Sequence, residues 1–339
     1  MKTPLRIGLV GFGRIGRNIF HLAYKNPNYQ FVAISDLGEP KLLHYLLVRD
    51  SVYGPMKNGA KLEGNFLVVD GQRVRLLPGG VPGEIAWDLF NVDVVIDATG
   101  RFRKFSELEK HIKAGAKRVF VTTPPEDEID RIVILGINDN DISVDDRIVS
   151  STSSTTQVLA LMLKILDEHF GVKRAMMTTV HAYTSDQPLA DTVGSNLRRC
   201  RSAVENIIPN ETFAPEIVES LMPKFKGKIG GVAFNVPIPD GSCVDLTSEL
   251  ERMPDVSEVN EVVKKVAEGS LKGIVGYTDD PIVSSDVIGV NESMIFDAKA
   301  TMIASNSLLK TLCWYDNGWG FSKRILELID CYARLEGKA

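Results

Sequence analysis

The sequence predicts an α/β domain built on a doubly wound parallel sheet, followed by an α+β domain with a mainly antiparallel sheet. Three observations support this prediction. Over about the first 150 residues, short and almost wholly apolar segments alternate with helical patterns, as buried parallel strands and their crossover helices do. A Gly-x-Gly-x-x-Gly motif lies between the first strand and the first helix. Further on, the apolar segments are longer and joined by few helices, which is typical of antiparallel sheets.

The composition is that of a globular protein with enough material for two domains. The chain has 339 residues, of which 44% are hydrophobic and 24% charged. Its net charge of −5 argues against a nucleic-acid or anionic membrane surface, since both need clustered positive charge. Without a membrane-spanning run or a signal-peptide pattern, we expect a cytoplasmic protein. The four cysteines are too scattered for a disulfide framework or a zinc site, so we expect no metal.

The glycine motif predicts a phosphate-binding turn. The apolar segment 5–10 is followed by Gly11, Gly13 and Gly16, and then by apolar residues at helical spacing. In such a turn Gly11 allows the tight bend, Gly13 lets a pyrophosphate approach the backbone, and Gly16 lets helix and strand pack closely. We expect the pyrophosphate over Gly13 and Arg14.

An acidic residue strengthens the dinucleotide prediction. The next apolar segment, 30–35, ends at Asp36, which lies 20 residues after Gly16. A carboxylate there accepts hydrogen bonds from the adenosine ribose and repels a 2′-phosphate, so NAD is favoured over NADP. The alternative is an ordinary strand–helix turn with a helix-capping aspartate.

The remaining strands of the first domain follow in order. The apolar segment 92–97 opens into Thr99 and Gly100, and we expect these two residues and Thr122 to face the cofactor at the strand ends. Ser106 and Glu109 have the spacing of a capping box for a helix that runs to Gly115. Further buried strands are expected at 118–122, 132–135 and 147–149.

A hydroxyl-rich turn follows the last of these strands. A run of Ser and Thr residues leads into helical apolar spacing from Val158 onward. Ser154 lies at the tip of the turn, where unpaired N–H groups at the start of a helix can stabilise an anion beside a nucleophile. The simpler alternative is a cluster of N-cap residues before a core helix.

In the second domain we expect strands at 176–181, 229–236, 243–250, 300–303 and 308–314. His181 ends the first of these strands and is a candidate acid or base. About thirty residues with little periodicity follow it and include the arginines at 198, 199 and 201, as functional or interface segments often do. A helix is expected to start near Thr212, and an amphipathic terminal helix at Ser322.

Several segments together resemble the phosphorylating glyceraldehyde-3-phosphate dehydrogenase family over nearly the whole chain. They are Gly11–Arg17, Asp50–Gly54, Ala98–Phe102, the Ser-x-Thr-Thr turn, Val180–Gln187, Leu197–Arg201, Asn206–Pro209 and Trp314–Gly320. The resemblance implies a Rossmann domain over residues 1–152, a catalytic domain over 153–318, and a C-terminal helix over 319–339 that returns to the first domain. It also implies a homotetramer, with the arginine-bearing segment packing across subunits.

The resemblance implies a covalent mechanism and a set of site residues. In this family a cysteine at the helix start attacks a small phosphorylated aldehyde such as glyceraldehyde 3-phosphate, a histidine takes its proton, hydride passes to the nicotinamide, and phosphate cleaves the acyl-enzyme. Ser154 and His181 stand at the two catalytic positions. The cofactor positions are Gly11, Gly13, Arg14, Ile15, Gly16, Asp36, Thr99, Gly100, Thr122 and Asn317. The inorganic-phosphate positions are Ser153, Thr155, Arg199 and Thr212, and the substrate-phosphate positions are Thr184, Asp186 and Asn235.

The chain departs from the family pattern where the chemistry is done. Ser154 replaces the cysteine, and a hydroxyl is far less acidic than a thiol of pKa about 8.5. Asn235 stands where an arginine clamps the substrate phosphate, and Phe213 stands where a glycine lines the phosphate pocket. Val10, Gln157 and Gly318 also replace usual family residues, and Thr192-Val193 replaces a pair common in NAD-specific members.

These departures leave three functional hypotheses. The first is a dehydrogenase made nearly inactive by a cysteine-to-serine replacement, either engineered or natural. The second is a non-catalytic NAD-binding scaffold or regulator, favoured by Asn235 and Phe213. The third is a slow esterase in which His181 activates Ser154. The sequence does not identify the aldehyde substrate, and NADP remains the alternative to NAD as cofactor.

Overall fold

The computed structural model describes residues 3–56, 59–305 and 307–337. The chain folds into two compact units. The first unit contains residues 1–153 together with 322–339, and the second contains residues 154–321. Each unit has its own large sheet. Within the described ranges, the helices are too short or too polar to traverse a lipid bilayer.

The first unit is built on a nine-stranded sheet with the order β10-β11-β9-β8-β1-β2-β7-β6-β5. Every neighbouring pair from β10 to β7 is parallel, and β6 and β5 add an antiparallel edge. The strands are β1 (Leu5–Val10), β2 (Tyr29–Asp36), β5 (Lys61–Glu63), β6 (Phe66–Val69), β7 (Gln72–Pro78), β8 (Val94–Asp97), β9 (Arg118–Val121), β10 (Arg131–Ile132) and β11 (Ile148–Ser150), with a separate small pair β3 (Arg49–Asp50) and β4 (Gly54–Pro55).

The order of these strands confirms the predicted doubly wound sheet. The chain leaves β1 toward β2 on one side and later returns to β8 on the other, so the winding reverses between β1 and β8. Ligands of such sheets bind beyond the carboxyl ends of the strands at this reversal. The helices of this unit are α1 (Arg14–Ala23), α2 (Pro40–Val48), α3 (Phe105–Lys113) and the short 3₁₀ helices η1 (Trp87–Phe90) and η2 (Asp139–Asp141).

The predicted start of α3 was wrong by two residues. The helix begins at Phe105, and the carboxylate of Glu107, rather than Glu109, accepts the backbone N–H of Lys104 at 3.1 Å. Glu109 instead bonds Lys113 one turn later. The pattern misled because an acidic residue is present at both positions, and only one of them can reach the orphan N–H groups of the first turn.

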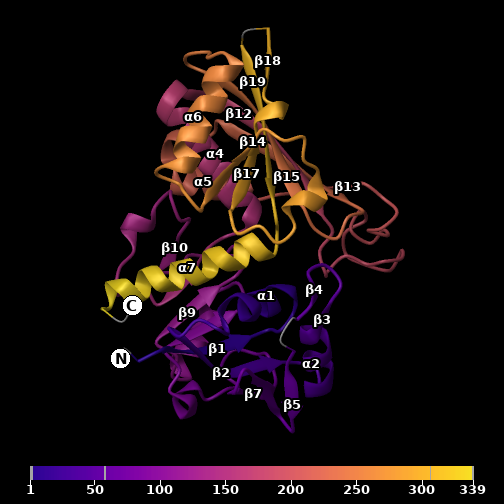
Figure 1. The fold of residues 1–339 in the computed structure, drawn as a ribbon, viewed down its shortest axis with the longest axis vertical. Helices are drawn as coiled ribbons and strands as arrows, with labels where there is room; N and C mark the ends of the chain where they lie inside the picture. Colours follow the sequence, from indigo (N-terminus) through magenta and orange to yellow (C-terminus); the bar gives the residue numbers. More distant parts are fainter. Residues whose placement is uncertain (1–2, 57–58, 306, 338–339) are drawn as a thin grey trace. The chain divides into compact units, whose positions relative to one another are not determined.

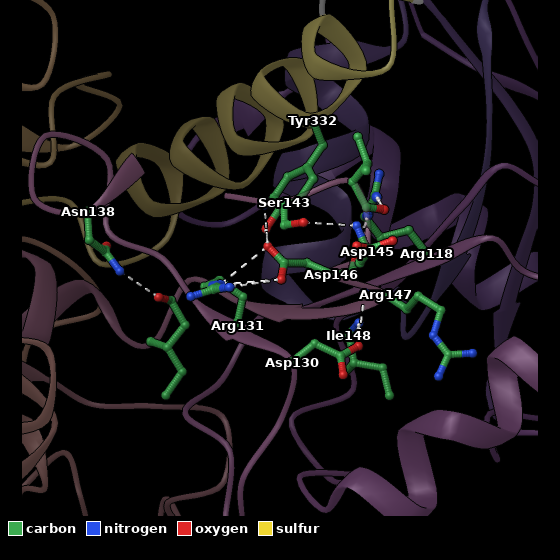
Figure 2. Close-up of polar contacts among 12 residues, drawn as sticks. Arg118, Asp130, Arg131, Asn138, Ser143, Asp145, Asp146, Arg147, Ile148 and Tyr332 are labelled. Atoms are coloured by element: carbon green, nitrogen blue, oxygen red, sulfur yellow. Dashed lines mark hydrogen bonds and ion pairs between the residues drawn. The ribbon is translucent and has the colours of Figure 1, made fainter. Parts of the chain in front are cut away.

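Residues of α7 (Trp319–Leu335) from Ser322 onward belong to the first unit. The hydroxyl of Tyr332 donates to Asp146 at 2.7 Å, and the guanidinium of Arg131 faces the same carboxylate at 3.3 Å (Figure 2). The Arg118 guanidinium lies over the Tyr332 ring at 4.4 Å and donates to the carbonyl of Asp146. A buried carboxylate therefore joins the terminal helix to the loop before β11.

The second unit is built on an eight-stranded sheet, with the order β13-β14-β12-β15-β19-β17-β16 and β18 paired to β19. Helices α4, α5 and α6 lie together on one side of its strands (Figure 1). The strands are β12 (Val172–Ala182), β13 (Ile208–Asn210), β14 (Ile229–Val236), β15 (Ser242–Leu250), β16 (Val275–Thr278), β17 (Met294–Asp297), β18 (Met302–Ala304) and β19 (Leu308–Tyr315). The helices are α4 (Ser154–Phe170), α5 (Ala214–Leu221), α6 (Val256–Glu268), η3 (Pro223–Phe225), η4 (Ser284–Val287) and η5 (Ala298–Ala300).

This sheet is mainly antiparallel, as predicted, but two of its pairs are parallel. Strand β12 runs parallel to β14, and β16 runs parallel to β17. The predicted cap of the terminal helix was also wrong. Helix α7 begins at Trp319, and Asp316 accepts the backbone N–H of Gly318 at 2.7 Å, whereas Ser322 lies inside the helix and is buried.

Candidate active site

Two glycines of the first turn are required by the fold itself. Gly11 has φ +84°, and a Cβ added to it would lie 2.7 Å from the backbone nitrogen of Thr99. A Cβ on Gly16 would lie 2.1 Å from the carbonyl oxygen of Gly11. These distances are shorter than any van der Waals contact, so side chains at either position would push the turn away from the reversal between β1 and β8.

Gly13 is different, because a Cβ there would meet no described atom within 4 Å. Gly13 is also the N-cap residue of α1 and provides no side-chain cap for the N–H groups that open the helix at Arg14 and Ile15. The turn therefore presents backbone donors and an uncovered glycine, an arrangement that fits close approach of a phosphate.

Asp36 lies at the end of β2 beside this turn. One of its carboxylate oxygens accepts the N–H of Phe12 at 2.6 Å, and the other accepts the N–H of Gly38 at 2.8 Å. Each carboxylate oxygen has a further lone pair. The carboxylate is thus fixed in position by backbone and can still accept hydrogen bonds from two ribose hydroxyls.

The end of β8 is held by a buried chain of polar side chains that no pattern in the sequence predicted. Trp87 donates to Nδ1 of His111 at 3.1 Å, so Nε2 of that ring carries the hydrogen and faces Asp97 at 3.4 Å. Asp97 in turn accepts both the N–H and the hydroxyl of Thr99. The hydroxyl of Thr122 donates to the carbonyl of Asp97 at 3.2 Å.

These contacts fix the shape of the β8 turn. They direct the Thr99 and Thr122 hydroxyls toward Asp97, and Gly100 follows with φ +68°. The part of this turn that lies closest to Gly11 is therefore its backbone, at Ala98 and Thr99, and not the two hydroxyl groups.

The serine-rich turn ends where α4 begins. Ser154 is the first residue of the helix, Ser153 and Ser154 are half-buried, and Thr155 is buried. Thr152, just before them, has φ +62°, which is a strained conformation for a β-branched residue. The hydroxyl of Ser150 supports it by accepting the Thr152 N–H at 3.0 Å. The fold thus keeps strain at the point where the chain enters α4.

Tyr315, a residue to which the sequence assigned no role, lies among residues of the helix start and of β12. Its hydroxyl is 2.8 Å from Oγ1 of Thr155 and 3.0 Å from Oγ1 of Thr179, and its ring centroid is 6.1 Å from that of His181. Burial raises the pKa of Tyr315 to about 12, so the phenol stays protonated at neutral pH. Tyr315 is therefore in contact with both Thr155, the residue after Ser154, and the ring of His181.

His181 lies near the end of β12 with its ring half-buried. Nδ1 is 2.6 Å from the carbonyl oxygen of Ala182. A carbonyl can only accept, so Nδ1 carries the hydrogen, and in the neutral ring the lone pair is on Nε2. This is the tautomer that a general base needs.

Asn235 pairs with His181 across the parallel strands β12 and β14. Its side chain is 6% exposed, with Nδ2 at 3.5 Å from the carbonyl of Ala182 and Oδ1 accepting from Asn210 at 3.4 Å. The position is therefore uncharged and occupied by hydrogen bonds within the sheet. Nearby in sequence to Asn210, Phe213 is 62% exposed.

The other predicted phosphate-binding residues fall into two groups. Arg199 forms an ion pair with Asp186, whose carboxylate also accepts the hydroxyl of Thr184. Thr212 instead accepts the backbone N–H of Ala214 at 3.3 Å at the start of α5. The structure thus brings Thr184, Asp186 and Arg199 together, while no described hydrogen bond links Thr212 to them.

Asn317 lies in the turn between β19 and α7. Its N–H donates to Asp240 at 3.2 Å, and its side-chain oxygen accepts from Ser242 at 3.0 Å. Burial, followed by the charge of Asp240, raises the pKa of the neighbouring Asp316 to about 6. The carboxylates of Asp240 and Asp316 therefore hold this turn by accepting the backbone N–H groups of Asn317 and Gly318.

Comparison with known proteins identifies both parts of the chain. Residues 5–105 match the NAD binding domain of glyceraldehyde 3-phosphate dehydrogenase, and residues 153–317 match its C-terminal domain. The chain is 42% identical over 325 residues to the glyceraldehyde-3-phosphate dehydrogenases of Priestia megaterium and Geobacillus stearothermophilus, an alignment that covers 96% of this chain and 97% of each relative. It is 43% identical over 332 residues to that of Borreliella burgdorferi, covering 96% of this chain and 98% of the relative.

Residues 5–105 are thus an NAD binding domain, and the glycine turn and Asp36 fit that cofactor. With both domains matched in order and with identity above 40% along nearly the whole sequence, the chain belongs to the glyceraldehyde 3-phosphate dehydrogenase family.

Proposed function

We propose that this chain is an NAD-dependent, phosphorylating aldehyde dehydrogenase of the glyceraldehyde 3-phosphate type, kept nearly inactive by a serine at the nucleophile position. The observation that carries the proposal is the position of Tyr315. Ser154 opens α4, and the Tyr315 hydroxyl lies 2.8 Å from Oγ1 of the adjacent Thr155, while its ring centroid lies 6.1 Å from that of His181. A nucleophile, a helix start and a base are thus present in one unit.

The residues proposed for NAD come from the family pattern. Gly11, Gly13, Arg14, Ile15 and Gly16 would hold the pyrophosphate, and Asp36 the adenosine ribose. Thr99, Gly100 and Thr122 would line the cofactor through the strand ends, and Asn317 would hold the nicotinamide amide. When bound, NAD supplies the acceptor for the hydride that leaves the aldehyde carbon.

His181 has the role of acid and base. With hydrogen on Nδ1, Nε2 can take the proton of the attacking group and later return it. The N–H groups at the start of α4 stabilise negative charge on the oxygen of the attacked aldehyde. A thiol at position 154 would ionise readily beside an imidazole and a helix N-terminus, whereas the Ser154 hydroxyl does not.

The residues proposed for the phosphate groups are Ser153, Thr155, Arg199 and Thr212 for inorganic phosphate, and Thr184, Asp186 and Asn235 for the substrate. Arg199 shares its charge with Asp186, and Asn235 adds none. We therefore expect weaker binding of phosphorylated aldehydes than a site with an arginine at 235 would give.

The test is Ser154→Cys. We expect the variant to reduce NAD with glyceraldehyde 3-phosphate and either phosphate or arsenate, and its thiol to titrate below 8.5, since the helix dipole and an imidazolium favour the thiolate. Ser153→Cys, one residue earlier on the same turn, is the matched control and should create no such activity. Adding His181→Asn to Ser154→Cys should lower the rate by roughly 10²–10⁴-fold.

The second candidate is a non-catalytic NAD-binding homologue, which the uncharged Asn235 and the exposed Phe213 favour. It predicts that Ser154→Cys binds NAD yet oxidises neither phosphorylated nor free short aldehydes. That result would replace the dehydrogenase proposal.

We also propose a homotetramer. On the face of the second sheet that α4, α5 and α6 do not cover, the side chains of Met176, Met302 and Leu308 are 60%, 52% and 42% exposed. Apolar side chains grouped on a sheet face are typical of an interface with another copy.

A further inference from the structure

Ser242 is a buried hydroxyl at the junction of the elements that hold the proposed site. It is the first residue of β15 and is 0% exposed. Its Oγ donates to the side-chain oxygen of Asn317 at 3.0 Å and accepts the backbone N–H of Ala182 at 3.0 Å. Its register partner on β19 is Tyr315. One hydroxyl thus joins the end of β12 to the turn that carries Asn317.

The contact with Asn317 fixes the direction of an amide. Because the amide oxygen accepts from Ser242, the NH₂ group lies on the other side of the amide as a donor. The backbone of the same residue is held by Asp240, two positions before Ser242. Side chain and main chain of Asn317 are therefore both fixed from the start of β15.

The backbone between Asp240 and Ser242 is constrained by a glycine. Gly241 has φ +82°, and a Cβ there would lie 2.0 Å from the carbonyl oxygen of Ser284. Only glycine fits between Asp240 and Ser242, so the two anchoring groups keep a constant spacing.

The contact with Ala182 ties the same hydroxyl to the strand end that carries the base. The carbonyl of Ala182 accepts the Nδ1 hydrogen of His181 at 2.6 Å, while its N–H is held by Ser242. Ala182, whose carbonyl sets the tautomer of His181, is therefore held by the same Ser242 hydroxyl that donates to the Asn317 side chain.

We propose that Ser242 is a positioning residue that orients the Asn317 amide so that its NH₂ group donates to the carboxamide of NAD. The inference rests on the proposed role of Asn317 toward the nicotinamide. Ser242 itself touches neither the cofactor nor the aldehyde, and acts by holding the amide in one of its two orientations before the cofactor arrives.

The experiment measures dissociation constants for NAD and for ADP-ribose, which lacks the nicotinamide, by calorimetry. Ser242→Ala should weaken NAD by roughly three- to tenfold, the scale of one hydrogen bond, and leave ADP-ribose unchanged. Ser248→Ala is the matched control, because Ser248 lies on the same strand, is also 0% exposed, and its hydroxyl has no hydrogen-bond partner in the described structure. It should change neither constant.

A double-mutant cycle separates positioning from general damage. If Ser242 acts through Asn317, Ser242→Ala combined with Asn317→Ala should bind NAD no more weakly than Asn317→Ala alone. Should Ser242→Ala not fold, Ser242→Cys keeps the size and a weak donor and is measured in its place, with the same selective loss expected.

Two results would overturn the inference while leaving the proposed function intact. One is equal weakening of NAD and ADP-ribose by Ser242→Ala. The other is a loss of NAD affinity in Asn317→Ala with none in Ser242→Ala. If Asn317→Ala itself leaves NAD affinity unchanged, the assignment of Asn317 to the nicotinamide fails first, and the inference falls with it.

Discussion

Asp36 is held in place by two backbone N–H groups before any ribose reaches it. We expect Asp36→Ala to weaken NAD and to narrow its advantage over NADP by about 1–2 kcal/mol, because hydrogen bonds to a charged group and repulsion of a 2′-phosphate are both lost. Titration of the two cofactors by calorimetry measures the change. An unchanged ratio of the two affinities would contradict the role given to this carboxylate.

Asp316 makes stability depend on pH in a direction that can be worked out. Its folded pKa of about 6 is above the ordinary value of 3.8, so between these values the folded state binds more protons and stability falls as pH rises. Above pH 6 the loss is complete. The causes are burial first and the charge of Asp240 second.

Asp240→Asn should therefore make the protein more stable above pH 6, by on the order of 1 kcal/mol, and flatten the fall between pH 4 and 6. The asparagine oxygen can still accept the N–H groups of Gly241 and Asn317 that Asp240 accepts now. Melting temperatures of both forms from pH 4 to 8 test this. A variant whose melting temperature falls as steeply with pH as the wild type would show that Asp240 does not act on Asp316.

At the residue scale, the sequence predicted positions whose reason is local. Gly11 and Gly16 follow from the turn, and the structure leaves no room for side chains there. Roles for Tyr315 and Ser242 could not be found this way, since each forms its hydrogen bonds with partners that are far away in sequence. A buried hydroxyl within a strand looks like any other strand residue until the register is known.

At the scale of elements, the sequence located most strands but not their neighbours. The segment 229–236 was predicted with the bounds that β14 has, yet nothing in its pattern indicated that it pairs in parallel with β12. Pairing depends on connections and on the opposite strand, whereas apolar alternation reports only which face is buried. Helix starts were misplaced for a related reason: α3 and α7 are capped by Glu107 and Asp316, in places where an equally suitable residue stood nearby in sequence.

The junction between α7 and the loop before β11 gives a prediction at this scale. Tyr332→Phe removes the donor that Asp146, 4% exposed, accepts at 2.7 Å (Figure 2), while the carboxylate keeps the N–H of Ser143 at 2.8 Å. We expect a loss of about 1–3 kcal/mol in the free energy of unfolding, the usual cost for a hydrogen bond to a charged group.

Urea denaturation measures that loss. Tyr24→Phe is the matched control, because Tyr24 stacks on Phe20 and its hydroxyl has no hydrogen bond among the described contacts. It should cost less than about 0.5 kcal/mol. Equal effects of the two variants would mean that the Asp146 contact does not hold the terminal helix.

At the scale of the whole molecule, the exposed apolar side chains of the second sheet give the last prediction. Arg174, Met176, Glu249 and Leu308 line a shallow groove on this face, and Met176 is 60% exposed. A second copy seated there would remove Met176 from water, so the wild-type chain should run in light scattering at about four times its mass of 37.3 kDa.

Met176→Lys places a charge at the centre of that face, and an unpaired buried charge costs several kcal/mol, so the variant should shift toward dimers or monomers as concentration falls. Leu89→Lys is the matched control, because Leu89 is 77% exposed but lies in η1 of the other unit. It should leave the mass unchanged. A wild-type mass near 37.3 kDa would sink the tetramer outright. A tetramer that survives Met176→Lys but not Leu89→Lys would instead move the interface to the first unit.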